Sequence, residues 1–141
     1  MPEEQQILLE AKEIKKVYGQ IIKTIALRKI SLTVKQNDFI AIIGPSGCGK
    51  TNLANILGVL DKPISGEVYF QNQSLGKMEV NELAEFRNEH IGFIFQFYFL
   101  LKEFTTLENV LIPAWIKDEI VPARKIKRSK ELLNWLILKN E

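Results

Sequence analysis

Three stretches near the start of the chain carry the hydrophobic patterns of strands. Residues Ile7–Tyr18 mix apolar and polar positions in rough alternation and end at Gly19, which predicts an edge strand. Residues 26–34 alternate more strictly, so one face is apolar, which predicts a half-buried strand. Residues 39–43 are apolar throughout and precede Gly44, a pattern typical of a central parallel strand that is covered on both faces.

Helical periodicity begins directly after this third stretch. From Lys50 to Leu60 the apolar residues recur at i, i+3, i+4 and i+7, which predicts a helix that residues 61–63 end. We expect a strand over 66–70 and then a polar turn. A second helix is predicted over about 80–88.

The rest of the chain predicts one more strand and two more helices. Residues 91–95 have the pattern of a short buried strand. Thr105 or Thr106 is a suitable cap for a helix through Leu111, and Pro122 is suited to start a final helix that runs to about Lys139.

Composition indicates a folded soluble domain. Of the 141 residues, 46% are hydrophobic and 26% are charged, which argues against disordered and low-complexity classes. A net charge of +2 gives no reason to expect a nucleic-acid partner. Cys48 is the single cysteine, so no internal disulfide is expected, and the start of the chain does not have the pattern of a signal peptide. The apolar stretches are too short to span a bilayer, so we expect any membrane association to be peripheral.

One motif carries recognisable chemistry: a glycine, four residues, a second glycine, lysine and threonine. It comprises Gly44, Pro45, Ser46, Gly47, Cys48, Gly49, Lys50 and Thr51. Glycines let the backbone point its amides inward around an anion, and the helix that follows adds the positive end of its dipole. Lys50 supplies a charge for the terminal phosphates and Thr51 a hydroxyl for Mg²⁺. The motif predicts nucleotide phosphate binding; a redox role for Cys48 is the less favoured alternative.

Three stretches besides this loop resemble the ATP-binding cassette (ABC) transporter ATPases. They are residues 15–19 (Lys-Lys-Val-Tyr-Gly), 65–68 (Ser-Gly-Glu-Val) and 91–96 (Ile-Gly-Phe-Ile-Phe-Gln). The resemblance implies that Tyr18 stacks on the adenine ring, against the alternative of an ordinary strand tyrosine. It also implies that Gln96 belongs to the glutamine loop, which senses the metal and the attacking water and touches the membrane partner, against the alternative of a plain surface amide.

The resemblance implies an α/β fold of the P-loop NTPase (ABC ATPase) type, in incomplete form. We expect an antiparallel β part and P-loop strand-helix core over about residues 1–95, and the glutamine loop and start of a helical subdomain over about 96–141. ATP and Mg²⁺ are the implied cofactors, and Thr51 and Gln96 are the implied metal-binding residues. The implied partners are transmembrane permease subunits and a second ATPase subunit, with no nucleic acid, and the implied location is the cytoplasmic face of the inner membrane.

A finer resemblance concerns the subgroup that contains the lipoprotein-releasing, macrolide-exporter and cell-division ABC ATPases. It rests on residues 57–61 (Leu-Gly-Val-Leu-Asp) and on the run from Gln96 to Thr105. The lipoprotein-releasing ATPase is the first choice within the subgroup, so the implied function is to energise export or release of a lipid-linked substrate. The macrolide-exporter and cell-division systems are the alternatives.

Several parts of the family pattern are missing from the 141 residues. There is no Leu-Ser-Gly-Gly-Gln signature, and residues 57–61 and 114–119 only imitate the acidic strand end that holds magnesium. His90 precedes Gln96, so it does not match the family's switch histidine and is expected to lie at the surface. We therefore expect an N-terminal portion of an ABC ATPase that is inactive by itself. A remnant without turnover and an unrelated phosphate-loop kinase or GTPase are the other interpretations.

Overall fold

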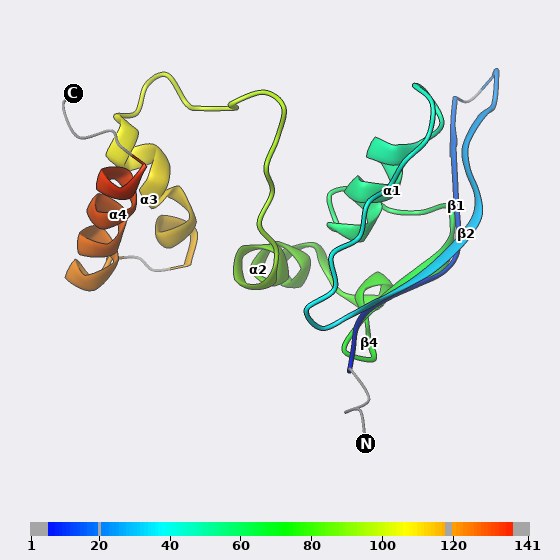
Figure 1. Cartoon of the computed structure of the whole chain (residues 1–141), viewed down its shortest axis with the longest axis horizontal. Helices are drawn as coiled ribbons and strands as arrows, with labels where there is room; N and C mark the ends of the chain where they lie inside the picture. Colours follow the sequence, from blue (N-terminus) through cyan, green and yellow to red (C-terminus); the bar gives the residue numbers. More distant parts are fainter. Residues whose placement is uncertain (1–5, 20, 118–119, 137–141) are drawn as a thin grey trace. The chain divides into compact units, whose positions relative to one another are not determined.

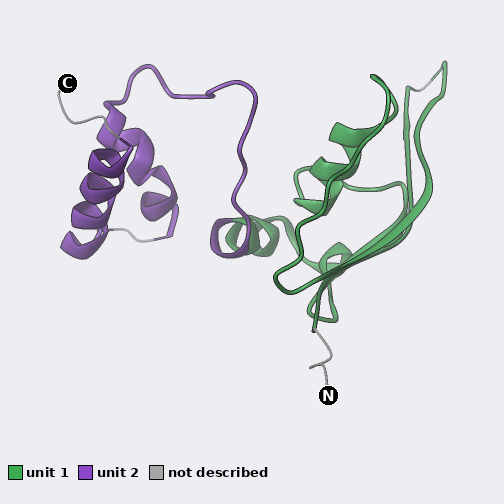
Figure 2. Ribbon diagram, viewed as in Figure 1, with its two compact units in different colours: residues 1–87 green, residues 88–141 purple. Residues whose placement is uncertain are grey.

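The computed structural model describes residues 6–19, 21–117 and 120–136, and it divides the chain into two compact units. The first comprises residues 1–87 and the second residues 88–141. Figure 2 shows the two units in different colours. None of the described helices is long and apolar enough to cross a membrane.

The first unit is built on an antiparallel sheet in the order β2-β1-β3-β4 (Figure 1). Its strands are β1 (Ile7–Tyr18), β2 (Thr24–Lys35), β3 (Ser65–Phe70) and the short β4 (Gln73–Ser74). The strands predicted over 7–18, 26–34 and 66–70 are thereby confirmed.

The sheet meets the core of the first unit at the middle of β1. Ala11 lies opposite Leu32 on β2 and Val68 on β3, and Ile14 on the same strand is fully buried. Burial of these apolar side chains stabilises the sheet through the hydrophobic effect. The central strand of this antiparallel part is therefore β1, which was predicted as an edge strand.

Helix α1 (Lys50–Leu57) buries Leu53 and Ile56 and ends three residues before its predicted limit. The amide of Val59 donates to the carbonyl of Ile56, and the amide of Leu60 to that of Asn55. This pair of bonds is a Schellman turn, which satisfies the last helical carbonyls and places Val59 at a left-handed φ of 59°. The turn after Leu57, rather than the segment 61–63, ends the helix.

The 3₁₀ turn η1 (Leu75–Lys77) lies in the first unit, and helix α2 (Val80–His90) belongs to the first unit up to Arg87 and to the second unit over its last three residues. Helix α2 buries Leu83 and Phe86, and the ring of Phe86 meets that of Phe70 edge to face at 5.0 Å. The helix predicted over 80–88 is confirmed and is two residues longer.

The second unit contains helices α3 (Thr106–Lys117) and α4 (Ala123–Trp135). Thr105 and Glu108 form a capping box, in which the Glu108 carboxylate accepts the Thr105 amide at 2.7 Å and the Glu108 amide donates to the Thr105 hydroxyl. The predicted cap at Thr105 is confirmed, and α3 extends beyond the predicted end at Leu111. Helix α4 starts after Pro122 as predicted; the predicted end at Lys139 lies outside the described residues.

The buried strands predicted over 39–43 and 91–95 are wrong for this structure. Both segments are irregular, and Phe39 and Ile94 are fully exposed. A strand needs neighbouring strands that hydrogen-bond to its backbone N–H and C=O groups. Among the described residues, the only paired strands are β1, β2, β3 and β4, so residues 39–43 and 91–95 have no partner strand. The antiparallel part and the helix after the phosphate loop are present as expected for the α/β architecture. The segment predicted as the central parallel strand, residues 39–43, is irregular.

Candidate functional site

The phosphate-loop motif connects the irregular segment 39–43 to the start of α1. Gly49 is the residue that caps this helix, with φ 99° and no side-chain capping bond. A Cβ at Gly49 would lie 2.5 Å from the carbonyl oxygen of Ala26 on β2, so only glycine fits this left-handed backbone against the strand. The backbone of the loop therefore packs closely against β2 at Gly49, where α1 begins.

The ammonium of Lys50 folds back over the loop that precedes it. Its Nζ donates to the carbonyls of Gly44 and Pro45, at 2.8 Å each, and lies 3.9 Å from Cys48 Sγ. These carbonyls belong to the loop itself, so they hold the cation at the mouth of the predicted phosphate site. A phosphate oxygen could take the place of such a carbonyl as the acceptor of the Lys50 ammonium. Because the phosphate oxygen is charged, it would make a stronger hydrogen bond.

The start of α1 has the features that the predicted ATP phosphates require. The first amides of a helix have no carbonyl one turn earlier to bond, and here no side chain caps them. The first turn also contains no acidic residue, so the positive end of the helix dipole is not neutralised locally. The remaining motif residues, Ser46, Gly47, the free thiol of Cys48, and Thr51, are exposed and accessible to a ligand.

Tyr18 lies at the end of β1, within a polar cluster that the sequence did not reveal. Its hydroxyl lies 2.9 Å from Asp61 Oδ2 and 3.1 Å from Asn52 Oδ1 on α1. Lys16 donates to Asp61 Oδ1 at 2.6 Å and to the carbonyl of Lys62 at 2.7 Å, and its Nζ lies over the Tyr18 ring, 5.1 Å from the centroid. The structure therefore connects the predicted adenine-stacking residue to the helix that follows the phosphate loop.

Electrostatics within this cluster favour a charged Asp61 and a neutral Tyr18. Partial burial opposes ionisation of Asp61, but the hydrogen bonds from Lys16, Tyr18 and the Lys62 amide outweigh it, so its pKa lies below the ordinary value. The pKa of Tyr18 is raised by desolvation and by its hydrogen bond to Asp61. The Asp61 carboxylate therefore accepts three hydrogen bonds within the cluster, from Lys16, Tyr18 and the Lys62 amide.

Gln96 lies in the second unit, in an exposed and irregular segment. The aromatic residues around it are also exposed, including Phe95, Phe97 and Tyr98. Among the described residues, no group of three or more His, Cys, Asp or Glu side chains could hold a metal ion. The metal roles of Thr51 and Gln96 therefore stay predictions that depend on a bound nucleotide for the other ligands.

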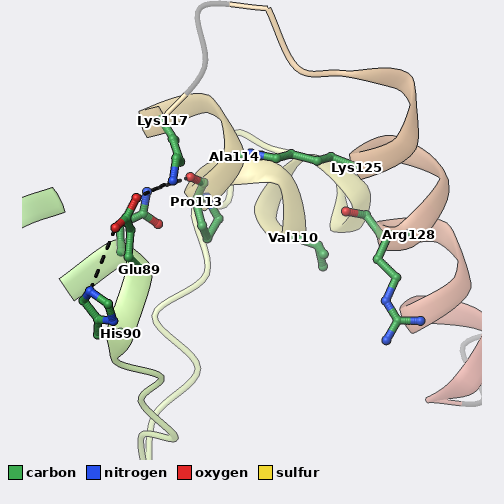
Figure 3. Close-up of a pocket in the computed structure, with 10 residues that line it drawn as sticks. Glu89, His90, Val110, Pro113, Ala114, Lys117, Lys125 and Arg128 are labelled. Atoms are coloured by element: carbon green, nitrogen blue, oxygen red, sulfur yellow. Dashed lines mark hydrogen bonds and ion pairs between the residues drawn. The ribbon is translucent and has the colours of Figure 1, made fainter. Parts of the chain in front are cut away.

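A hollow of about 610 Å³ lies within the second unit, between the end of α2 and helices α3 and α4 (Figure 3). In it, Lys117 forms an ion pair with Glu89, and His90 Nε2 lies 3.9 Å from the same carboxylate. The hydrogen bond from Lys117 is the main cause that lowers the pKa of Glu89. His90 is exposed, as predicted, and no motif in the sequence signalled this cluster.

A family model described as ABC transporter matches residues 27–141. Among curated relatives, the chain is 46% identical over 127 residues to the ABC transporter ATP-binding protein MJ1508 of Methanocaldococcus jannaschii, covering 89% of this chain and 56% of the relative. It is 41% identical over 128 residues to the lipoprotein-releasing system ATP-binding protein LolD of Francisella tularensis subsp. holarctica, covering 90% and 55%. The LolD of Bacteroides fragilis is 46% identical over 114 residues, covering 80% and 52%.

A solved structure gives the same picture at the level of the fold. The ATP-binding cassette MJ0796, in a dimeric post-hydrolysis state bound to ADP and Pi, matches with a TM-score of 0.82 and 36% sequence identity. The match covers 90% of this chain and 56% of that structure. The chain spans about half the length of the relatives that it matches.

Proposed function

This chain belongs to the ABC transporter family, and from that premise we propose that residues 44–51 bind the phosphates of ATP in the ATP-binding subunit of an ABC transporter. The observation that carries the proposal is the Lys50 ammonium, which two loop carbonyls hold at the uncapped start of α1. Calorimetric titration with ATP tests this step, and a chain that takes up no ATP at millimolar concentration would contradict it.

Each predicted site residue has a part in this proposal. Lys50 neutralises the terminal phosphates, and the amides at the start of α1 bind phosphate oxygens. Tyr18 stacks on the adenine ring, since 43% of its surface is exposed and a base can cover it. The relative MJ0796, which was solved with ADP and Pi, supports the choice of nucleotide.

Magnesium is the second proposed cofactor. Thr51 would provide a hydroxyl next to Lys50, and the family resemblance implies Gln96 as a further oxygen ligand. Hard oxygen ligands of this kind suit Mg²⁺, which usually keeps only one or two protein ligands beside phosphates and water. When bound, the ion would neutralise charge on the terminal phosphates.

We propose partners and location on the same basis. Two ATPase subunits would associate around nucleotide, as the dimeric state of MJ0796 suggests, and transmembrane permease subunits would anchor the pair at the cytoplasmic face of the inner membrane. The exposed aromatic run around Gln96 supports a protein partner, because apolar patches of this kind mark interaction surfaces.

For the transported molecule we propose a lipid-linked protein, since two of the relatives are lipoprotein-releasing ATPases. The test uses proteoliposomes that contain the transporter assembled with this chain. We expect ATP-dependent release of an acylated lipoprotein and no release of the same protein without its acyl chains. Equal release of both forms, or release blocked by a macrolide that is itself exported, would contradict this substrate and favour the macrolide-exporter alternative.

We also propose that the 141 residues bind ATP without turning it over. Hydrolysis needs a group that orients or deprotonates water in addition to phosphate and metal binding. The sequence contains no signature motif, and the Asp61 carboxylate is occupied by Lys16, Tyr18 and the Lys62 amide. Hydrolysis coupled to transport is proposed for an assembly that also supplies an acidic strand end and a signature.

The measurement is phosphate release from ATP and magnesium, with Lys50→Ala as the reference. We expect the wild-type chain to release phosphate no faster than this variant. A clear rate that depends on Lys50 would contradict the proposal and would make Asp61, or Asp118 and Glu119 outside the described residues, catalytic candidates again.

A further inference from the structure

The ring of Tyr18 needs a constraint beyond its own strand if it is to meet a base in a fixed place. Tyr18 is the last residue of β1, where it pairs with Thr24, and 43% of its surface is exposed. An exposed ring at a strand end can change rotamer freely, and ordering it on binding costs conformational entropy. A residue that holds the ring beforehand would reduce this cost.

Asp61 makes the contacts that such a role requires. One carboxylate oxygen accepts the Tyr18 hydroxyl at 2.9 Å, and the other accepts the Lys16 ammonium at 2.6 Å and the Lys62 amide at 2.8 Å. Lys16 in turn lies over the ring that Asp61 holds, 5.1 Å from the centroid. The hydroxyl and the ring are therefore both constrained from the same carboxylate.

The cluster also joins Tyr18 to the phosphate loop. Asn52, whose Oδ1 lies 3.1 Å from the Tyr18 hydroxyl, is on α1 one residue after Thr51 and two after Lys50. A rigid helix turn thus connects the hydroxyl to the residues proposed to bind phosphate. Such an arrangement sets the distance between a base platform and a phosphate site before a ligand arrives.

We propose that Asp61 is a positioning residue for nucleotide recognition, which holds the Tyr18 ring against the purine base while Lys50 binds the phosphates. The inference rests on the proposed function, because it assumes that residues 44–51 take the phosphates of ATP. It assigns Asp61 a role in selecting a nucleoside triphosphate over a triphosphate that lacks a base.

The experiment compares two ligands, ATP and inorganic tripolyphosphate, by calorimetry. Asp61→Ala removes the carboxylate that accepts the Tyr18 hydroxyl, so it should weaken ATP binding by about three- to tenfold, the effect of one hydrogen bond of ordinary strength. Tripolyphosphate affinity should stay unchanged, because the phosphate loop is intact. Tyr18→Phe keeps the ring but loses the hydroxyl, so it should reproduce the same selective loss, whereas Asp61→Asn retains an acceptor and should recover part of the ATP affinity.

A double variant tests whether the two residues act through one contact. Tyr18→Phe combined with Asp61→Ala should lose less ATP affinity than the sum of the two single losses, because both variants remove the same hydrogen bond. Tyr18→Ala measures the full contribution of the ring to ATP binding. The stacking of a base on an aromatic ring contributes about 1 to 3 kcal/mol, so this variant should weaken ATP binding by roughly 5- to 150-fold.

The chain provides a matched control in the same unit. Tyr69 donates to Glu67 at 2.8 Å, and Lys12 lies over its ring at 5.0 Å, so this group repeats the chemistry of the Tyr18 cluster on another part of the sheet. Glu67→Ala and Tyr69→Phe should leave the affinities for both ligands unchanged.

The outcomes separate this inference from the function beneath it. If Asp61→Ala leaves ATP binding unchanged, or weakens ATP and tripolyphosphate equally, the positioning role is wrong although the phosphate loop stands. If Asp61→Ala does not fold, an unchanged ATP affinity in Tyr18→Phe overturns the inference by itself. If the wild-type chain binds neither ligand, or binds both regardless of Lys50, then the proposed function fails first.

Discussion

Lys50→Ala should reduce ATP affinity more than any other single substitution at the phosphate loop. Its Nζ donates to the Gly44 and Pro45 carbonyls at 2.8 Å, which places a single positive charge where the terminal phosphates are proposed to bind. Removing one partner of a close, hydrogen-bonded charge pair costs about 2 to 5 kcal/mol, or at least about 30-fold in affinity. No other motif side chain carries a charge.

The measurement is calorimetric titration with ATP, with far-ultraviolet circular dichroism to confirm the fold. Alanine has a higher helix propensity than lysine, so α1 should persist in the variant. Lys77→Ala is the matched control, because this lysine lies exposed at the end of η1 in the same unit and should not change the affinity. Equal ATP affinity in wild type and Lys50→Ala would remove the phosphate-loop proposal.

Lys50→Arg separates charge from shape. Arginine keeps the positive charge but replaces a compact ammonium with a planar group that needs more room and a different geometry. If charge alone mattered, arginine would restore ATP binding. We expect only partial recovery, since a planar guanidinium does not reproduce the position in which one compact ammonium donates to both the Gly44 and Pro45 carbonyls.

The strands of the antiparallel sheet could be predicted because their signal is local, whereas their antiparallel pairing was implied only by the family resemblance. Alternation over 7–18 and 26–34 predicts the strand period, and Gly19 marks the end of β1, whereas β2 begins two residues before and ends one residue after its predicted limits. The failures at 39–43 and 91–95 have one cause: an apolar run reports that side chains need cover, but it contains no information on whether a neighbouring strand is present. The early end of α1 was missed because the Schellman turn uses Val59, a residue that rarely adopts positive φ.

In the candidate site, too, the residues that are contiguous in sequence could be predicted and the contacts between distant residues could not. The phosphate loop is contiguous, so its spacing alone identifies every residue from Gly44 to Thr51. The contacts of Asp61 with Lys16 and Tyr18 cross 45 and 43 positions of sequence, and they exist because the end of β1 lies beside the turn after α1. No local pattern records such a pairing, so Asp61 could be read only as an imitation of an acidic strand end.

The second large effect is expected from Gly49→Ala. At φ 99°, an alanine pays about 1 to 2 kcal/mol for its left-handed backbone. Its Cβ would also lie 2.5 Å from the Ala26 carbonyl, a backbone group of β2 that cannot move without disturbing the sheet. Adding about 1 to 3 kcal/mol for overpacking, we expect the free energy of unfolding to fall by about 2 to 5 kcal/mol.

Two other glycines separate the contributions of strain and contact in denaturant titrations. Gly47 has φ 78° with open space around its Cβ position, so Gly47→Ala should carry the backbone cost alone, about 1 to 2 kcal/mol. Gly92 has neither a close neighbour nor a positive φ, so Gly92→Ala should change stability by less than about 0.5 kcal/mol. Because Gly49 also sets the angle at which α1 leaves the loop, its variant should lose ATP affinity along with stability. If Gly49→Ala proved no more destabilising than Gly47→Ala, the close packing of the loop against β2 would be refuted.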